Sequence, residues 1–305
     1  MTEQHEFWPD GARLAVSVSM QFEAGGQPIS GASGPITEPI LDGFPDLGQN
    51  TFYEYGARES VPRILDLLDQ HQIKMTSFMI GEAVRRHPQV AAEIVRRGHE
   101  AGAHGRRWQR QYHLPRPQET EWIADSVQAI EQATGTRPVG YNNYWIRPGV
   151  NTLEILQELG FTYHIDDLSA DEPFLQLING QPFAAVPYTV HLNDIASFDF
   201  PGFNPAAYEQ QLIDEFDQLY AEGATRRRMM VIGLHERISG HASRVRVLDR
   251  IFTRLRNHDV WWARKDQIAQ WVLDHPDTAA WGDRDPAPVS LDSRCGNPVE
   301  VGCQG

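Results

Sequence analysis

Short apolar runs alternate along this chain with longer segments in which apolar residues return at helical spacing. Apolar runs bounded by turn residues are typical of buried strands. Such runs occupy residues 14–20, 75–80, 139–144, 184–190, 229–234 and 260–263. The pattern therefore predicts strands spread over most of the chain, with room for helices between them.

The helical spacing of apolar residues is clearest over residues 61–68. Val61, Ile64, Leu65 and Leu68 follow the i, i+3, i+4, i+7 spacing of a stripe that faces a core, and Ser60 stands where a cap would. Similar stripes and stop signals predict helices over residues 88–98, 117–134, 151–160, 208–220, 243–256 and 265–273. Strands that alternate with helices predict a parallel sheet, either a β/α barrel or an open doubly wound sheet.

The barrel is the preferred of these two folds. No Gly-x-Gly-x-x-Gly motif follows the first strand, and Ala24-Gly25-Gly26 is a poor substitute for this dinucleotide-binding fingerprint. Residues 24–52 are rich in Gly, Pro and polar residues, which predicts a long loop that acts as a lid or as a subunit contact. We expect one α/β domain over residues 1–275, followed by a Pro-, Gly- and Asp-rich tail over residues 276–305.

Composition and charge narrow the classes of partner. The formal net charge is −14 at pH 7, and Arg226-Arg227-Arg228 is the only dense basic run, so no nucleic-acid partner is expected. No stretch stays apolar over the roughly 20 residues of a membrane helix, and the acidic start lacks the layout of a signal peptide. We therefore expect a cytoplasmic protein without a membrane partner. Cys295 and Cys303 lie in the tail, and we assign them no role in the chemistry.

Polar side chains suited to catalysis follow several of the predicted strands. In a parallel barrel the reactive groups lie at the carboxyl ends of the strands. Gln21 and Glu23 end the first strand on the same side, His104 ends a short strand, and His235 ends the most apolar run. Each of them alone has a ready explanation as a core or surface residue. Two histidines and a glutamate at equivalent positions of one barrel are harder to explain that way, and they predict a catalytic site.

Longer motifs around these positions resemble the polysaccharide deacetylase superfamily. The motifs similar to that superfamily are Gly98-His99-Glu100 through His104-Gly105, residues 135–140 and Pro148-Gly149-Val150-Asn151-Thr152. The motifs similar to its allantoinase branch, rather than to its sugar deacetylases, are residues 53–58, 104–108, 186–189, 193–194 and 232–235. The resemblance implies a distorted (β/α) barrel of the polysaccharide deacetylase type in a single domain.

The resemblance also implies a metal site that this chain has partly lost. Deacetylases of the superfamily use two aspartates near the end of the first strand, one as the base and one on the metal, together with a His-x-x-x-His pair. Gln21 and Glu23 stand at the positions of the aspartates, and Trp108 stands at that of the second histidine. An indole has no lone pair for a metal, and a catalytic zinc usually keeps three protein ligands. We therefore favour no metal; a zinc or manganese ion, if bound, would have Glu23, His104 and His235 as ligands.

The allantoinase resemblance implies hydrolysis of a non-peptide C–N bond. Water would attack the carbonyl of a small cyclic amide, ureide or imide, and the ring C–N bond would break. Glu23, with His104, is assigned to positioning and deprotonating the water, and His235 to protonating the leaving nitrogen. The identity of the ring stays open.

Five further residues are assigned to substrate binding: Gln21, Trp108, Arg147, Asn193 and Asp194. Arg147 matches an arginine of the allantoinase motif and would hold a carboxylate, a carbonyl or the oxyanion through its planar fork. A structural role for Arg147, as a loop residue that caps the next helix, stays open beside this one.

Two other functions stay open. The chain could be a metal-dependent carbohydrate de-N-acetylase, although Trp108 in place of the second histidine argues against it. It could also be a non-catalytic pseudoenzyme that keeps the barrel as a binding scaffold, against which the retained Glu23, His104 and His235 argue. The resemblance further implies a homo-oligomer, with a tetramer as the expected form.

Overall fold

The structure is a computed structural model that describes residues 7–36, 38–198 and 204–275. The predicted tail over residues 276–305, with Cys295 and Cys303, lies outside the described residues. Within the described ranges, no helix combines the length and the apolar character needed to cross a bilayer.

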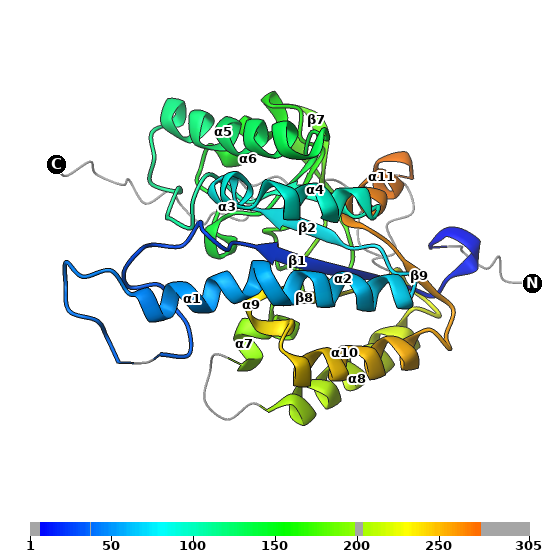
Figure 1. The fold of residues 1–305 in the computed structure, drawn as a ribbon. Coiled ribbons are helices and arrows are strands. Elements are labelled where there is room, and N and C mark those ends of the chain that lie inside the picture. The colour runs from blue at the N-terminus through cyan, green and yellow to red at the C-terminus, as the bar shows by residue number, and fades with distance from the viewer. Residues whose placement is uncertain (1–6, 37, 199–203, 276–305) are drawn as a thin grey trace, which may run out of the picture.

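A curled, mostly parallel sheet forms the centre of the molecule (Figure 1). Its strands are β1 (Leu14–Phe22), β2 (Thr76–Met79), β3 (Glu100–Ala103), β4 (Gly140–Tyr141), β5 (Tyr163–His164), β6 (Phe174–Ile178), β7 (Gln181–Ala185), β8 (Met229–His235) and β9 (Val260–Trp262). They lie in the order β6-β7-β5-β4-β3-β2-β1-β8, and β9 pairs with the first part of β1. The pair β6 and β7 is antiparallel, and the other pairings are parallel. The predicted single-domain, distorted β/α barrel is confirmed.

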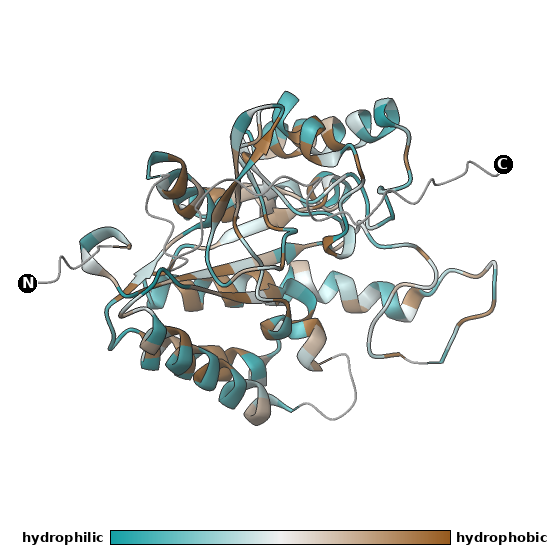
Figure 2. Cartoon of the chain, turned by 180° about the vertical axis from the view of Figure 1, so that it is seen from behind, coloured by the Kyte–Doolittle hydropathy of each residue, from teal (hydrophilic) through white to brown (hydrophobic). Residues whose placement is uncertain are grey.

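Helices cover the outer face of this sheet. They are α1 (Leu47–Tyr55), α2 (Val61–Gln70), α3 (Gly81–Arg86), α4 (Pro88–Arg96), α5 (Arg116–Thr134), α6 (Thr152–Glu158), α7 (Asp194–Phe198), α8 (Pro205–Glu222), α9 (Glu236–Ser239), α10 (Ala242–Leu255) and α11 (Lys265–Asp274), with the short turns η1 (Pro9–Gly11), η2 (Gly56–Ser60), η3 (Tyr144–Ile146) and η4 (Val190–Leu192). Figure 2 shows that the apolar sides of the helices turn toward the sheet and that their polar sides turn outward. This is the arrangement that the helical stripes predict.

The central strand β1 has two differently built faces. Val16, Val18 and Met20 pack into the core between the sheet and the helices. The alternate residues Ser17 and Ser19 point into the barrel, where they too are buried. This alternation carries on past the end of β1 and aims Gln21 and Glu23 at the same side.

The structure corrects several local predictions. Residues 24–52 are not all loop, because α1 begins at Leu47. Ser60 does not cap a helix, because η2 joins α1 and α2 into one continuous rod and the Ser60 hydroxyl makes no cap hydrogen bond. The predicted strand over residues 184–190 starts and ends earlier, as β7. The predicted strand over residues 139–144 is cut short because η3 bends the chain after β4.

Candidate active site

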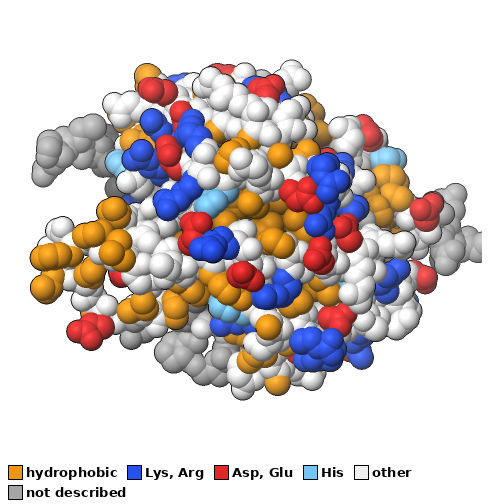
Figure 3. Space-filling view, viewed as in Figure 1, with side chains coloured by type: hydrophobic (Ala, Val, Ile, Leu, Met, Phe, Trp, Pro, Cys, Tyr) orange, Lys and Arg blue, Asp and Glu red, His pale blue; other side chains and the backbone are white. Residues whose placement is uncertain are grey.

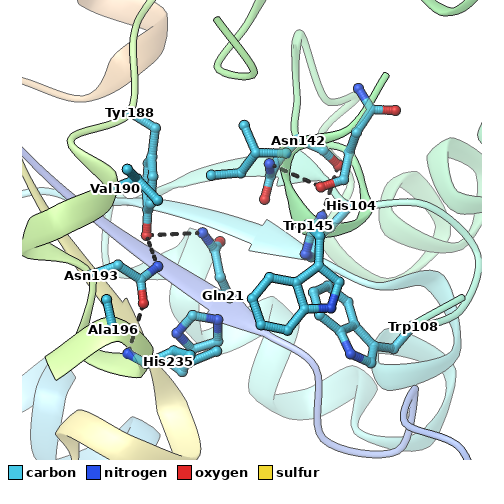
Figure 4. Close-up of a pocket in the computed structure, with 13 residues that line it drawn as sticks. Gln21, His104, Trp108, Asn142, Trp145, Tyr188, Val190, Asn193, Ala196 and His235 are labelled. Carbon is cyan, nitrogen blue, oxygen red and sulfur yellow. Dashed lines mark hydrogen bonds between the residues drawn. The ribbon is translucent and has the colours of Figure 1, made fainter. Parts of the chain in front are cut away.

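A cavity of about 190 Å³ opens where the carboxyl ends of the parallel strands meet (Figure 4). Gln21 from β1, His104 after β3 and His235 from β8 line it. The remaining lining residues are Trp108, Asn142, Asn143, Trp145, Ile146, Tyr188, Val190, Asn193, Ile195 and Ala196. The strand ends therefore bring most of the predicted site residues to one place, as parallel-barrel geometry requires.

Glu23 lies fully buried beneath this cavity, between two histidines and an arginine. Its Oε1 lies 3.4 Å from His104 Nε2 and 3.8 Å from His235 Nε2. Its Oε2 accepts a hydrogen bond from Arg237 Nη1 at 2.5 Å. Burial alone would raise the pKa of Glu23, but the charges of Arg237 and His235 outweigh burial and lower the pKa to about 2. Glu23 is therefore a carboxylate throughout the neutral range.

Arg237 belongs to α9, directly after β8, and its guanidinium lies between two buried carboxylates. Besides Glu23, Glu236 Oε2 is 4.0 Å from Arg237 Nη1. The other oxygen of Glu236 accepts hydrogen bonds from the backbone N–H groups of Glu23 and Ala24, at 3.0 and 2.8 Å. The guanidinium also lies over the ring of Tyr53, 4.4 Å from its centroid. This cation–π contact and the carboxylates fix a positive charge under the site.

His235 forms a dyad with Asp194, at the start of α7. Its Nδ1 donates to Asp194 Oδ1 at 2.7 Å, and its backbone N–H donates to Asp194 Oδ2 at 2.6 Å. Ser239 Oγ donates to the same carboxylate at 2.7 Å. Burial would lower the pKa of His235, but the charges of Asp194 and Glu23 outweigh it and raise the pKa. His235 therefore favours the imidazolium form, with Nε2–H toward the cavity.

His104 is oriented by a backbone carbonyl. Its Nδ1 lies 2.8 Å from the backbone carbonyl of Asn142, and a carbonyl only accepts, so Nδ1 carries a proton. In neutral His104 the lone pair is then on Nε2, which has no hydrogen-bond partner among the described residues. Gly105, at a φ of 75°, turns the chain directly after His104, and a Cβ there would come within 2.9 Å of Trp122. This tight turn sets the direction of the histidine.

Amide side chains and a tyrosine form the polar wall of the cavity. Tyr188 Oη accepts from Gln21 Nε2 at 3.4 Å and from Asn193 Nδ2 at 2.7 Å. Asn193 Oδ1 accepts from the backbone N–H of Ile195, which fixes the orientation of the Asn193 amide. Gln21 Oε1 is buried and has no hydrogen-bond partner among the described residues. The wall thus offers an open acceptor to a ligand N–H.

Aromatic rings and the loop after β4 form the opposite wall. Trp108 packs on His104 with ring centroids 5.3 Å apart and on Tyr144 at 4.5 Å. Trp145 and Ile146 have φ values of 51° and 56°, a left-handed backbone conformation that residues other than glycine seldom adopt. Asp166 anchors this loop, because its carboxylate accepts from the backbone and side chain of Asn143 and from the side chain of Asn142.

Two residues assigned to substrate binding lie elsewhere. Arg147 is exposed on the loop after η3 and does not line the cavity. Asp194 is fully buried behind His235, so it contacts the histidine and not the cavity. Sequence reasoning missed Asp166, Tyr188 and Arg237. Asp166 and Arg237 each follow a strand end within two residues, which is the signal that would have found them.

The donors at this site do not suit a divalent metal ion. Within the described ranges, no three His, Cys, Asp or Glu side chains are grouped so that they could hold one. Arg237 already supplies a positive charge to Glu23, and the guanidinium would repel a metal ion bound to that carboxylate. Trp108, at the position expected for a second histidine, offers no lone pair.

Comparisons with known proteins match this sequence and fold over most of the chain. The sequence model of the polysaccharide deacetylase family matches residues 50–164. A protein of Schizosaccharomyces pombe, whose name proposes a polysaccharide deacetylase, is 32% identical over 298 residues, which cover 88% of this chain and 93% of that protein.

Two crystal structures are similar in both sequence and fold. One is a Pseudomonas aeruginosa PAO1 protein, also described as a proposed polysaccharide deacetylase, with 35% identity and a TM-score of 0.83 over 89% of this chain and 95% of its own. The other is Puue allantoinase, with 34% identity and a TM-score of 0.83 over 90% of this chain and 95% of its own.

Proposed function

Because this chain belongs to the polysaccharide deacetylase superfamily of C–N bond hydrolases, we propose that it opens a small cyclic amide, ureide or imide. Water attacks a ring carbonyl, and the ring C–N bond breaks. The observation that carries this proposal is the cavity itself, about 190 Å³ in volume and walled by Gln21, Asn193 and aromatic rings. A flat, neutral ring with alternating N–H and C=O groups fits such walls, because amides pair with both kinds of group.

Gln21 gives the ring its orientation. Its carbonyl oxygen is a buried acceptor without a partner among the described residues, and a buried acceptor gains most from a ligand N–H. Tyr188 and Asn193 hold this amide in place. The ring then lies between the amide wall and Trp108, with one carbonyl toward the histidines.

Glu23 and His104 activate the water. A water molecule in contact with both Glu23 Oε1 and His104 Nε2, which are 3.4 Å apart, donates one hydrogen bond to each. With a pKa of about 2, Glu23 holds and orients the water without taking its proton. The Nε2 lone pair of His104 takes that proton as the oxygen bonds to the ring carbonyl.

His235 completes the reaction from the other side. The attack produces a tetrahedral oxyanion, and the nearby imidazolium of His235 stabilises this charge. As the intermediate collapses, the C–N bond breaks and His235 Nε2–H gives its proton to the leaving nitrogen. Asp194 keeps His235 charged and oriented, so it acts as a positioning residue. The product is a ring-opened acid with a free amine, amide or urea group.

A second candidate is a carbohydrate de-N-acetylase, which the names of the relatives favour. It cleaves the same kind of C–N bond but needs an open groove for a sugar chain. The small cavity and the place of Trp108 favour the ring substrate instead.

Hydrolysis of a small substrate panel tests both candidates. The panel is allantoin, hydantoin, succinimide, glutarimide and an N-acetylglucosamine oligomer, offered to chelator-treated protein with and without zinc or manganese. We expect ring opening that survives chelation, with kcat lowered about 10²–10⁴-fold in His235→Ala and unchanged in His258→Asn, a histidine just beyond the end of α10 and outside the cavity lining. Deacetylation that appears only with added metal would instead establish the protein as a carbohydrate de-N-acetylase. No turnover of any substrate would leave the barrel as a binding scaffold.

A further inference from the structure

Glu236 is a fully buried carboxylate that takes no part in the reaction described above. It is the first residue of α9, directly after His235, and α9 packs against α1, η2 and α2. On the face of the molecule over these helices, Lys and Arg side chains are mixed with Asp and Glu (Figure 3). An exposed glutamate would be ordinary there. A carboxylate removed from water needs partners that offset its lost hydration, and those partners indicate what Glu236 does.

One oxygen of Glu236 holds the chain where β1 ends. Its Oε1 accepts hydrogen bonds from the backbone N–H groups of Glu23 and Ala24, at 3.0 and 2.8 Å. The ladder between β1 and β8 ends just before this point, since its last pair is Gln21 with His235. Hydrogen bonds to a carboxylate are stronger than those to a neutral acceptor. Glu236 therefore takes over from the ladder in fixing the backbone of Glu23.

The second oxygen of Glu236 has different surroundings. Glu236 Oε2 has no hydrogen-bond partner among the described residues, and it lies 4.0 Å from Arg237 Nη1. That same nitrogen donates to Glu23 Oε2 at 2.5 Å, so Arg237 is already bound to Glu23. The contact with the backbone thus needs one correctly placed oxygen, whereas the interaction with Arg237 needs only a charge. Substitutions can separate these two contributions.

Gly56 in η2 confines this carboxylate from the other side. A Cβ at Gly56 would lie 2.5 Å from Glu236 Cγ and 3.0 Å from the backbone nitrogen of Arg237, so only a glycine lets η2 approach α9 this closely. The turn itself is wide, because Val61 N–H donates to the carbonyl of Gly56, five residues back. Wide turns of this kind within helices are frequent at functional sites. The side chain of Glu236 is held between η2 and the end of β1.

We propose that Glu236 is a positioning residue for Glu23: by binding the N–H groups of Glu23 and Ala24, it fixes where the Glu23 carboxylate lies between the two histidines. The role of Glu23 in this inference rests on the proposed function. Glu23 Oε1 lies 3.4 Å from His104 Nε2 and 3.8 Å from His235 Nε2. A shift of about 1 Å at the end of β1 would carry this oxygen away from the water that it orients, and a misplacement of that size can cost about 10²-fold in rate.

Two conservative substitutions separate position from charge. Glu236→Gln keeps an oxygen at the place of Oε1 and removes the charge, whereas Glu236→Asp keeps the charge and withdraws both oxygens by one methylene. With a turned-over substrate from the panel, we expect kcat to stay within about threefold of the parent in Glu236→Gln and to fall about 10–10²-fold in Glu236→Asp, with KM unchanged in both. The reverse order would show that Glu236 acts through its charge, and equal kcat values in the two variants would make it a structural residue. Either result overturns the proposal.

Gly56→Ala displaces the same carboxylate without altering it. The φ of Gly56 is −54°, so alanine introduces no backbone strain there, and we expect kcat to fall with KM unchanged, as in Glu236→Asp. The matched control is Glu172→Asp, which shortens another buried carboxylate, paired with Arg227 before β8. This control should lower stability and leave kcat and KM as in the parent. A fall in kcat as large as that of Glu236→Asp would assign the loss to stability and overturn the proposal.

Hydrogen exchange at the N–H groups of Glu23 and Ala24, followed by NMR, tests the contact without a substrate. We expect slow exchange in the parent and in Glu236→Gln, and exchange at least about tenfold faster in Glu236→Asp. The N–H of Val186, which donates to the carbonyl of His164, is the internal control and should exchange equally in all three. If no panel substrate is opened, the proposed function fails, and these rates alone decide whether Glu236 holds Glu23. Unchanged exchange in Glu236→Asp overturns the proposal.

Discussion

Replacing Arg237 with methionine tests the charge arrangement beneath the cavity. Arg237 is fully buried, donates to Glu23 at 2.5 Å and lies 4.0 Å from Glu236, a second buried carboxylate. Methionine keeps a long side chain over Tyr53 and removes the guanidinium. Both carboxylates then lose the cation that they face.

The structure sets the expected size of the effect. Removing one partner of a buried ion pair costs about 3–5 kcal/mol. For a chain of this size each kcal/mol lowers Tm by about 2–4 °C, so Tm should fall by roughly 6–20 °C. In the parent the pKa of Glu23 lies near 2, below its ordinary 4.5, so the pair contributes stability above pH 4.5 and loses it as pH falls toward 2. In Arg237→Met burial raises the pKa of Glu23 instead, and the deficit should shrink on acidification.

Urea unfolding followed by tryptophan fluorescence measures this loss, within a double-mutant cycle. Glu23→Gln removes the charge from the other side, and Glu23→Gln with Arg237→Met should be more stable than the sum of the two single losses predicts. Arg246→Met, which removes an exposed arginine of α10, is the control and should change stability little. Additive losses, or a loss in Arg237→Met as small as in the control, would refute the buried pair as described.

Three further predictions concern single side chains. Asp194→Asn should lower kcat about 10²–10⁴-fold and move the alkaline limb of the pH–rate profile to lower pH, because Asp194 raises the pKa of His235; an unmoved limb would contradict the dyad. Burial lowers the pKa of Lys265 from 10.5 to about 7, so the unfolded chain binds a proton that the folded chain lacks, and stability should rise with pH between these values. Urea unfolding at pH 7 and pH 9 should show this rise in the parent and not in Lys265→Met. Gln21→Leu should raise KM for a ring with a free N–H and not for its N-methyl analogue, because only the former uses Gln21 Oε1; equal changes in the two KM values would remove Gln21 from the orientation of the ring.

The features that the sequence determined are those that depend only on residues close together along the chain. Alternation along β1 determined that Gln21 and Glu23 point to the same side of the sheet, because successive side chains of any strand point to opposite faces. The apolar run that ends in His235 determined that this histidine stands at a strand end. Both statements need only neighbouring residues; in the structure Gln21 lines the cavity and His235 ends β8. Short elements escaped the same rules, since β5 has two residues and no period can be read from so few.

Tertiary structure decided which polar groups meet. His235 pairs with Asp194, 41 residues away, and Glu23 pairs with Arg237, 214 residues away, and no spacing along the chain marks either pair. These contacts turned Asp194 from a candidate substrate ligand into the partner of a histidine, and they placed a guanidinium beside Glu23. The physical reason is that a charge pairs with whatever the fold brings within a few ångströms after water is excluded. The sequence by itself therefore determined that Gln21, His104 and His235 stand at strand ends by the mouth of the barrel, and the packing of strands distant in sequence decided which other residues join them and what roles they take.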